Sequence, residues 1–275
     1  MTNRRLAILG AGNMGRAIIG GLLRSGTRPE HLQVGERSGE QRALLSRELG
    51  LSSSADNAAA VRGATVVVVA VKPSDVIAVL APLAALLESE RPLLISVAAG
   101  IRIATLAAAT GGGIEIVRAM PNRAALVGAG ATGLYAPSQV GAAARASAAQ
   151  VLGSVGEVAW VASEDALDVV TALSGSGPAY FFLLAEHMAE AAQALGLEAP
   201  IARQLARMTL YGAGVLARSG DADLARLRAE VTSPGGTTEA ALRVFERAKL
   251  REIIAQALGA AVKRGHELAA SGPKP

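Results

Sequence analysis

The segment Arg5-Leu-Ala-Ile-Leu-Gly10-Ala-Gly-Asn-Met-Gly15 decides the fold of this 275-residue chain. A short apolar run, Leu6 to Leu9, stops at a glycine-rich turn, and apolar residues then recur at helical spacing from Arg16 to Arg24. This order predicts a strand, a tight turn and a helix, the first part of a βαβ unit.

The continuous apolar run from Ala64 to Val71 extends this interpretation, because valine without alternation is typical of a parallel strand covered on both faces. Strands continue to alternate with helices of about ten residues, which predicts an α/β fold with a Rossmann-type, doubly wound parallel sheet. The other strands that we expect are His31–Gly35, Leu93–Val97, Ile114–Arg118, Ala131–Tyr135 and Glu157–Val161. One helix is expected from Ser74 to Leu87.

After Ser163 the pattern changes to helices alone. The expected helices are rich in alanine and leucine and cover 165–173, 179–195, 201–218, 224–230, 237–247 and 250–270. We therefore predict two domains, a Rossmann-type α/β domain over residues 1–163 and an all-helical domain over residues 164–275.

Composition excludes several classes of protein. The chain has no cysteine, which removes disulfide frameworks, thiolate metal sites and thiol nucleophiles, and we predict no metal site. Its 27 basic and 23 acidic residues are interspersed and only 3% of residues are aromatic, so nucleic-acid binding is not expected.

Neither a membrane helix nor a signal peptide is expected. The longest aliphatic run, Val66 to Val71, is far shorter than the roughly 20 residues that a membrane span needs. The uncharged stretch from Ala124 to Ala144 is broken by glycine and proline. The apolar run from Leu6 to Leu9 is too short for a signal peptide, so we expect a cytoplasmic protein.

The turn from Gly10 to Gly15 has the spacing G-x-G-x-x-G, and Glu36 follows at the end of the second predicted strand. Glycines at these positions let the backbone and the start of a helix approach a dinucleotide pyrophosphate. Glu36, Arg37 and Ser38 bear on the choice of cofactor. A carboxylate there binds a ribose 2′-hydroxyl, whereas an arginine accommodates a 2′-phosphate.

Two arrangements of these residues stay open. In one, Glu36 is drawn into an ion pair with Arg37, and Arg37 and Ser38 bind the phosphate of NADPH. In the other, Glu36 faces the ribose and favours NADH. We expect NADPH to be preferred, with NADH possible.

Two more segments are candidates for the cofactor site. Ala70-Val-Lys72-Pro73 follows the buried valine strand, at the edge of the sheet where ligands bind. Asn57 precedes a short predicted helix, where it serves either as a helix cap or as a contact to the nicotinamide ribose.

The helical half contains two turns rich in glycine and hydroxyl groups, Leu173-Ser-Gly-Ser-Gly-Pro-Ala-Tyr180 and Val231-Thr-Ser-Pro-Gly-Gly-Thr-Thr-Glu239. Each opens a predicted helix. Two helix starts that face one pocket would bind a carboxylate through backbone N–H groups. The alternative is that Ser176 and Ser233 are ordinary helix caps.

Together these motifs resemble the pyrroline-5-carboxylate reductase family, which catalyses the last step of proline synthesis. The resemblance runs from about residue 4 to residue 270 and includes Arg118-Ala-Met-Pro-Asn122 and Val127-Gly-Ala-Gly130. It implies a Rossmann domain followed by a helical dimerisation domain. It also implies NAD(P)H as hydride donor, 1-pyrroline-5-carboxylate as substrate, and subunits that exchange helices and in some members form a decamer.

The resemblance also assigns roles to residues. Those implied at the cofactor are Gly10, Gly12, Asn13, Met14, Gly15, Arg37, Ser38, Asn57, Ala70, Val71, Lys72 and Pro73. Those implied at the substrate are Ser176, Ser233, Gly236, Thr237 and Thr238. Thr238 is the hydroxyl expected to serve catalysis, by donating a proton to the ring nitrogen or relaying one from water. No histidine is expected to be catalytic.

The chain departs from the family pattern at Arg123-Ala124, where Thr-Pro is usual, and at Glu36, where NADPH-preferring members often have Asn. Two other functions stay open, a related dehydrogenase of a small hydroxy acid and a non-catalytic dinucleotide-sensing protein. The first typically carries a lysine acid/base on a helix of its second domain. Neither Lys249 nor Lys263 lies in such a motif.

Overall fold

The computed structural model describes residues 5–220 and 223–270, and side chains as far as residue 267. The chain forms two compact units. The first runs to Gly175 and also includes the residues from Ala261 onward, and the second is Ser176–Ala260. The domain boundary that we expect after residue 163 stays a prediction. The outer ends of both predicted domains, residues 1–4 and 271–275, lie outside the described residues.

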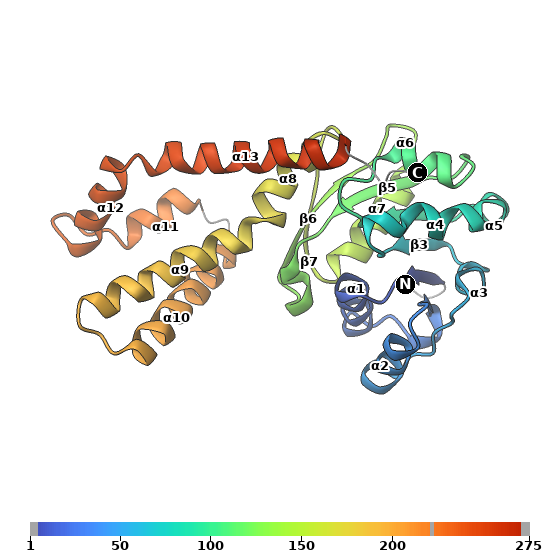
Figure 1. The fold of residues 1–275 in the computed structure, drawn as a ribbon, viewed down its shortest axis with the longest axis horizontal. Helices are drawn as coiled ribbons and strands as arrows, with labels where there is room; N and C mark the ends of the chain where they lie inside the picture. Colours follow the sequence, from blue (N-terminus) through green and yellow to red (C-terminus); the bar gives the residue numbers. More distant parts are fainter. Residues whose placement is uncertain (1–4, 221–222, 271–275) are drawn as a thin grey trace. The chain divides into compact units, whose positions relative to one another are not determined.

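The first unit is built on a seven-stranded sheet with the order β2-β1-β3-β4-β5-β6-β7 (Figure 1). Its strands are β1 (Leu6–Leu9), β2 (Leu32–Gly35), β3 (Val66–Val69), β4 (Leu93–Ser96), β5 (Ile116–Met120), β6 (Gly130–Tyr135) and β7 (Gly156–Trp160). Strands β1 to β5 pair with one another in parallel. The predicted α/β class and the Rossmann-type sheet are confirmed.

The expectation of a wholly parallel sheet is wrong at one place, because β6 pairs antiparallel to β5. The connection between them is only a short 3₁₀ segment, η4 (Arg123–Val127). A parallel return needs a crossover of a dozen or more residues, so a link of this length forces the antiparallel direction. Helix α7 (Ala142–Gly153) then supplies a full crossover, and β7 lies parallel to β6.

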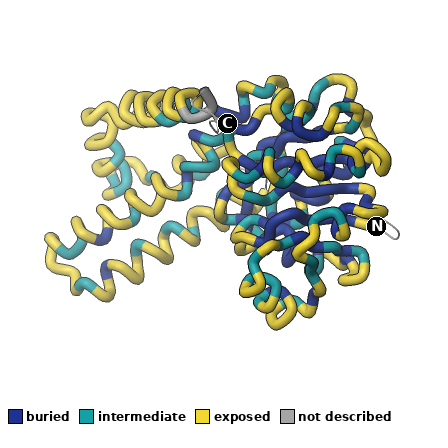
Figure 2. Tube along the Cα trace, turned by 45° about the vertical axis from the view of Figure 1, so that its right-hand side comes forward, coloured by how far each residue is buried: buried dark blue, intermediate teal, exposed yellow. Residues whose placement is uncertain are grey.

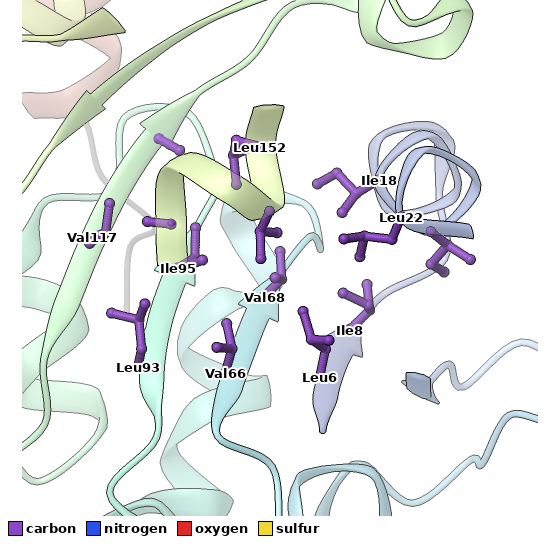
Figure 3. Packing of buried hydrophobic residues seen from close by; sticks show 14 of the residues in the cluster. Leu6, Ile8, Ile18, Leu22, Val66, Val68, Leu93, Ile95, Val117 and Leu152 are labelled. Carbon is purple, nitrogen blue, oxygen red and sulfur yellow. The ribbon is translucent and has the colours of Figure 1, made fainter. Parts of the chain in front are cut away.

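Alternate residues of the central strands enter two separate cores. Leu6, Ile8, Val66 and Val68 pack with α1 (Asn13–Arg24) and α7 on one face, as Figure 3 shows for this cluster. The intervening residues of the same strands form the core on the other face, which includes Ala7, Leu9, Val67 and Val69. All four valines of β3 are at most 3% exposed. The run of valines is therefore a strand covered on both faces.

The helices of the second face are short. They are α3 (Asn57–Val61), α4 (Val76–Leu80), α5 (Ala84–Glu90) and α6 (Ile103–Ala109), and α2 (Gly39–Leu49) follows β2. The single helix expected from Ser74 to Leu87 is wrong. A 3₁₀ turn, η3 (Ala81–Leu83), divides it at Pro82, which lacks the N–H that a continuous helix needs.

A buried ion cluster joins β5 to α8 (Ala166–Val170). Arg118, 4% exposed, lies 3.1 Å from Glu164 Oε1 and 3.9 Å from Asp168 Oδ1. Glu164 Oε1 also accepts a hydrogen bond from the Ile103 N–H at the start of α6. At the rim of the cluster, the hydrogen bond to Asp165 raises the pKa of Arg102 above its usual value. These contacts fix α8 on the sheet.

The second unit consists of α9 (Gly177–Ala194), α10 (Ala199–Arg218), α11 (Leu224–Glu230), α12 (Thr237–Arg247) and most of α13 (Leu250–Ala270). Among its described residues only Gly177, Ala189 and Ala202 are buried, and most of the others are exposed, with some of intermediate burial (Figure 2). Large apolar side chains lie on its surface, such as Phe181 at 60% and Tyr211 at 66% exposure. An apolar surface of this kind is typical of an association interface.

One helical stretch among the described residues, Ala166–Ala194, is long and apolar enough to cross a membrane by length and composition. The prediction that the chain has no membrane helix is not contradicted by length and composition alone. The stretch is weak evidence for a membrane span, since an apolar helix that packs against protein passes the same test.

Candidate active site

A cleft lies at the carboxyl ends of β1, β2 and β3. Its lining includes seven of the residues predicted for the cofactor, Gly10, Gly12, Arg37, Asn57, Ala70, Val71 and Lys72. The carboxyl ends of parallel strands are where ligands bind in open α/β sheets. The cleft therefore has the position expected of a dinucleotide site.

The three glycines of the first turn differ in what a side chain would meet. Gly10 has φ +93°, which disfavours other residues. A Cβ on Gly15 would overlap the Gly10 carbonyl oxygen, so the helix can start this close to the strand only with glycine there. A Cβ on Gly12 would meet nothing within 4 Å. Gly12 thus leaves open space beside the backbone, as a bound pyrophosphate requires.

Asn13, Met14 and Gly15 form the first turn of α1. That turn has no side-chain cap and no acidic residue. Its N–H groups and the positive end of the helix dipole fit an anionic group.

Glu36 connects the glycine turn to the end of β2. Its Oε2 accepts a hydrogen bond from the Ala11 N–H at 2.7 Å, and its Oε1 accepts one from the Ser38 N–H at 2.8 Å. Arg37 pairs with Asp75 at 3.0 Å instead. The ion pair between Glu36 and Arg37 that we considered is therefore not formed. Ser38 caps α2 by accepting from the Gln41 N–H at 3.3 Å.

Asn57 is the first residue of α3, whereas Asp56 caps that helix through the Ala58 N–H. The alternative that Asn57 is a helix cap is therefore wrong. Its amide lies against Gly35, where a Cβ would overlap Asn57 Oδ1. Lys72 is exposed at the cleft, and Pro73 begins the 3₁₀ turn η2 (Pro73–Asp75).

Three lining residues were not predicted, Gly35, Asp75 and Val79. Asp75 follows the Lys72-Pro73 motif by two residues, and its carboxylate could have been considered as a partner for Arg37. Gly35 and Val79 carry no chemical signal in the sequence, because only the packing of β2 and α4 brings them to the cleft.

The predicted substrate residues lie in the helical unit. Ser176 precedes α9, and Ser233, Gly236, Thr237 and Thr238 form the turn into α12. Within the described part of the chain, no hydrogen bond is made by the hydroxyls of Ser176, Ser233, Thr237 or Thr238. Neighbouring hydroxyls behave differently, because Ser174 and Thr232 donate to the Val170 and Arg228 carbonyls.

These observations correct the capping interpretation. Ser176 occupies the cap position of α9, but its side chain makes no capping bond, and the cap position of α12 belongs to Gly236. Glu239 instead supports the α12 turn, since its Oε2 accepts from the Gly235 N–H at 2.7 Å. This bond ties the residue before the cap position to the first turn of α12.

The two turns do not meet within one chain. In Figure 1 the start of α9 and the start of α12 lie at opposite ends of the helical unit. A single pocket lined by both turns therefore requires a second copy of the chain.

The histidines lie outside these positions. His31 contacts Arg28, and His266 lies 3.3 Å from Asp168 Oδ2. His187 is exposed on α9, and its hydrogen bond to Glu190 raises its pKa above the usual value.

Comparison with known proteins adds the family. Residues 164–268 match a family model described as pyrroline-5-carboxylate reductase dimerisation, and residues 5–100 match one described as NADP oxidoreductase coenzyme F420-dependent. A pyrroline-5-carboxylate reductase of Pseudomonas aeruginosa is 44% identical over 98% of this chain and 98% of its own length. The chain belongs to the pyrroline-5-carboxylate reductase family.

Solved structures agree with this family. The pyrroline-5-carboxylate reductase of Coxiella burnetii superposes with a TM-score of 0.93 at 40% identity, covering 96% of this chain and 98% of that one. The Plasmodium falciparum pyrroline carboxylate reductase, with NADP bound, has a TM-score of 0.79 at 27% identity over the same shares of the two chains. The predicted family is confirmed.

Substitutions in the glycine turn should separate binding from folding. Gly12→Val is expected to leave the melting temperature near that of the wild type, because the side chain enters open space. It should weaken NADPH binding at least about tenfold by filling the space of the pyrophosphate. Titration calorimetry and thermal unfolding measure the two effects.

Gly15→Ala is the matched variant. Its methyl group would overlap the Gly10 carbonyl, so it should lower the free energy of unfolding by about 1–3 kcal/mol. Wild-type NADPH affinity in Gly12→Val would show that the open space beside Gly12 is not the binding space.

Proposed function

We propose that the chain reduces the C=N bond of 1-pyrroline-5-carboxylate to give L-proline, the final step of proline biosynthesis. Family membership supports this function, and one observation in the structure carries it. The hydroxyls of Ser176, Ser233, Thr237 and Thr238 are left unbonded beside two helix starts, while their neighbours Ser174 and Thr232 bond to helix carbonyls. Uncommitted hydroxyls and N–H groups can bind a carboxylate.

The cofactor supplies hydride when it is bound. Gly10, Gly12 and the first turn of α1, Asn13 to Gly15, would hold its pyrophosphate. Asn57 and the segment from Ala70 to Pro73 would surround its ribose and nicotinamide. This placement rests on the cleft at the strand ends and on the open space beside Gly12.

In the reaction, hydride adds to the carbon of the C=N bond and a proton ends on the ring nitrogen, so that the imine becomes a secondary amine. A protonated imine is the better electrophile, and the protein therefore needs to position the substrate and supply a proton. Thr238, half-buried and without an internal partner, would hydrogen-bond the ring nitrogen and donate the proton or relay it from water.

The test of this function is direct. The purified full-length chain, mixed with NADPH and 1-pyrroline-5-carboxylate, should consume NADPH and form proline in equal amounts. If the chain consumes NADPH with a small keto acid but not with the imine, the result would favour the alternative function, a dehydrogenase of a small hydroxy acid. Binding of NADPH without turnover of either compound would favour a sensing protein.

Thr238→Ala should lower kcat by about a hundredfold, the lower limit of the range for a lost proton-transfer group. The dissociation constant of NADPH should change less than about twofold, because the cofactor residues are untouched. Steady-state kinetics and calorimetric titration measure these quantities. Unchanged turnover would remove Thr238 from the mechanism.

We propose NADPH as the preferred donor, with NADH possible. Arg37 supports this preference, because its side chain lies at the cleft and is 84% exposed, although it pairs with Asp75. A guanidinium there can bind a 2′-phosphate through charge-assisted hydrogen bonds. Glu36, held by the Ala11 and Ser38 N–H groups, supports the use of NADH through the ribose hydroxyl.

Arg37→Ala should raise the KM for NADPH about tenfold or more and leave the KM for NADH nearly unchanged, because only NADPH carries the 2′-phosphate. Glu36→Gln is the matched variant and should act mainly on NADH. Parallel titrations of both variants with both cofactors measure the preference. Equal effects of Arg37→Ala on the two cofactors would contradict it.

Self-association is expected of a chain with a dimerisation region, and we propose a dimer with exchanged helices that forms larger assemblies, such as a decamer. The nearly coreless helical unit and the separation of the two substrate turns within one chain support the exchange. We also propose a cytoplasmic location, since a chain without cysteine has no need of an oxidising compartment.

A further inference from the structure

A π-turn separates α8 from α9. It spans Thr171–Gly175 and ends immediately before Ser176, the residue that we place at the substrate. Single π-turns inside helical stretches are uncommon and often lie at functional sites. The sequence predicts ordinary helix as far as Leu173 and a glycine-rich turn after it, and the π-turn covers the place where the two meet. The sheet contacts both ends of the π-turn, and these contacts can stabilise its unusual geometry.

Asn122 makes such a contact. This residue follows β5 and is 9% exposed. Its Nδ2 donates to the Ser174 carbonyl at 3.0 Å, and its Oδ1 accepts from the Ala131 N–H at 3.1 Å. An asparagine amide has one donor end and one acceptor end, so these two partners fix its orientation. Asn122 thereby links the start of β6 to the π-turn.

The other end of the π-turn is held by close packing. Val170, the last residue of α8, lies over Gly133 in β6, where a Cβ would come within 2.8 Å of both valine methyl groups. Valine is branched at Cβ and has little rotamer freedom, so it cannot move aside easily. Figure 1 shows α8 beside β6, and the two elements are in contact. The turn is thus fixed at both ends against the same strand.

We propose that Asn122 is a positioning residue for the substrate. By holding the Ser174 carbonyl, it sets the direction of the next two peptide groups and hence of the Ser176 N–H and hydroxyl. The hydroxyl of Ser174 is bonded to the Val170 carbonyl and that of Thr171 to the Leu167 carbonyl, so both are already engaged in the turn. This role rests on the proposed function, which places Ser176 at the substrate carboxylate.

Asn122→Asp tests the role in the full-length enzyme. The variant keeps an acceptor for the Ala131 N–H but presents a carboxylate oxygen to the Ser174 carbonyl, which repels it and leaves that carbonyl without its donor. We expect the KM for 1-pyrroline-5-carboxylate to rise about tenfold or more, with a smaller change in kcat. The dissociation constant of NADPH, measured without substrate, should change less than about twofold.

Thr110→Val is the matched control. It also removes buried side-chain hydrogen bonds to backbone carbonyls, those of Leu106 and Ala107, but at the end of α6. Its KM for the imine should equal that of the wild type, even where its melting temperature falls as much as that of Asn122→Asp. An equal rise of KM in the control would mean that lost stability, and not the π-turn, causes the effect.

A second pair of variants covers the case in which Asn122→Asp does not fold. Gly133→Ala should displace Val170 and raise the KM for the imine, and adding Val170→Ala should restore it. A wild-type KM in Asn122→Asp, or in Gly133→Ala, would overturn the role of Asn122 and its packing. Absence of imine reduction by the wild type would instead overturn the proposed function.

Discussion

Burial of β3 on both faces is the constraint on which the rest of the structure depends. A strand of four valines cannot leave either face in water, so it needs a helical layer on each side and a neighbouring strand at each edge. Crossover helices then make β1, β2, β3 and β4 parallel. Their carboxyl ends share one edge of the sheet, and the cleft lies at that edge.

Local patterns made much of this predictable. The glycine turn and the valine strand are local patterns, which depend only on neighbouring residues. They therefore predicted β1, β3 and most of the residues that line the cleft. Pairing direction was missed at β6, because it depends on how few residues η4 provides between two strands. Pro82 is a helix-breaking residue that the sequence itself shows, so the division between α4 and α5 could have been predicted.

The candidate substrate residues were predictable as turns but not as a site. Sequence cannot show whether a serine hydroxyl is bonded to a nearby carbonyl, as Ser174 is, or uncommitted, as Ser176 is. Nor could it give Asn122, which it placed in a family motif, a structural role, because the contact with Ser174 joins segments 52 residues apart. Such residues emerge only when the fold places strands and helices together.

The helical unit has almost no interior of its own, since three small residues are all that its described part buries. The unit lies within the region that matches the family's dimerisation model, and apolar contacts between copies add to its stability only when the copies meet. The stability of this helical unit therefore depends on the concentration of the chain. Dilution should lower the stability of the helical unit, and the concentration of the chain in the cell helps to determine how far its helices are ordered.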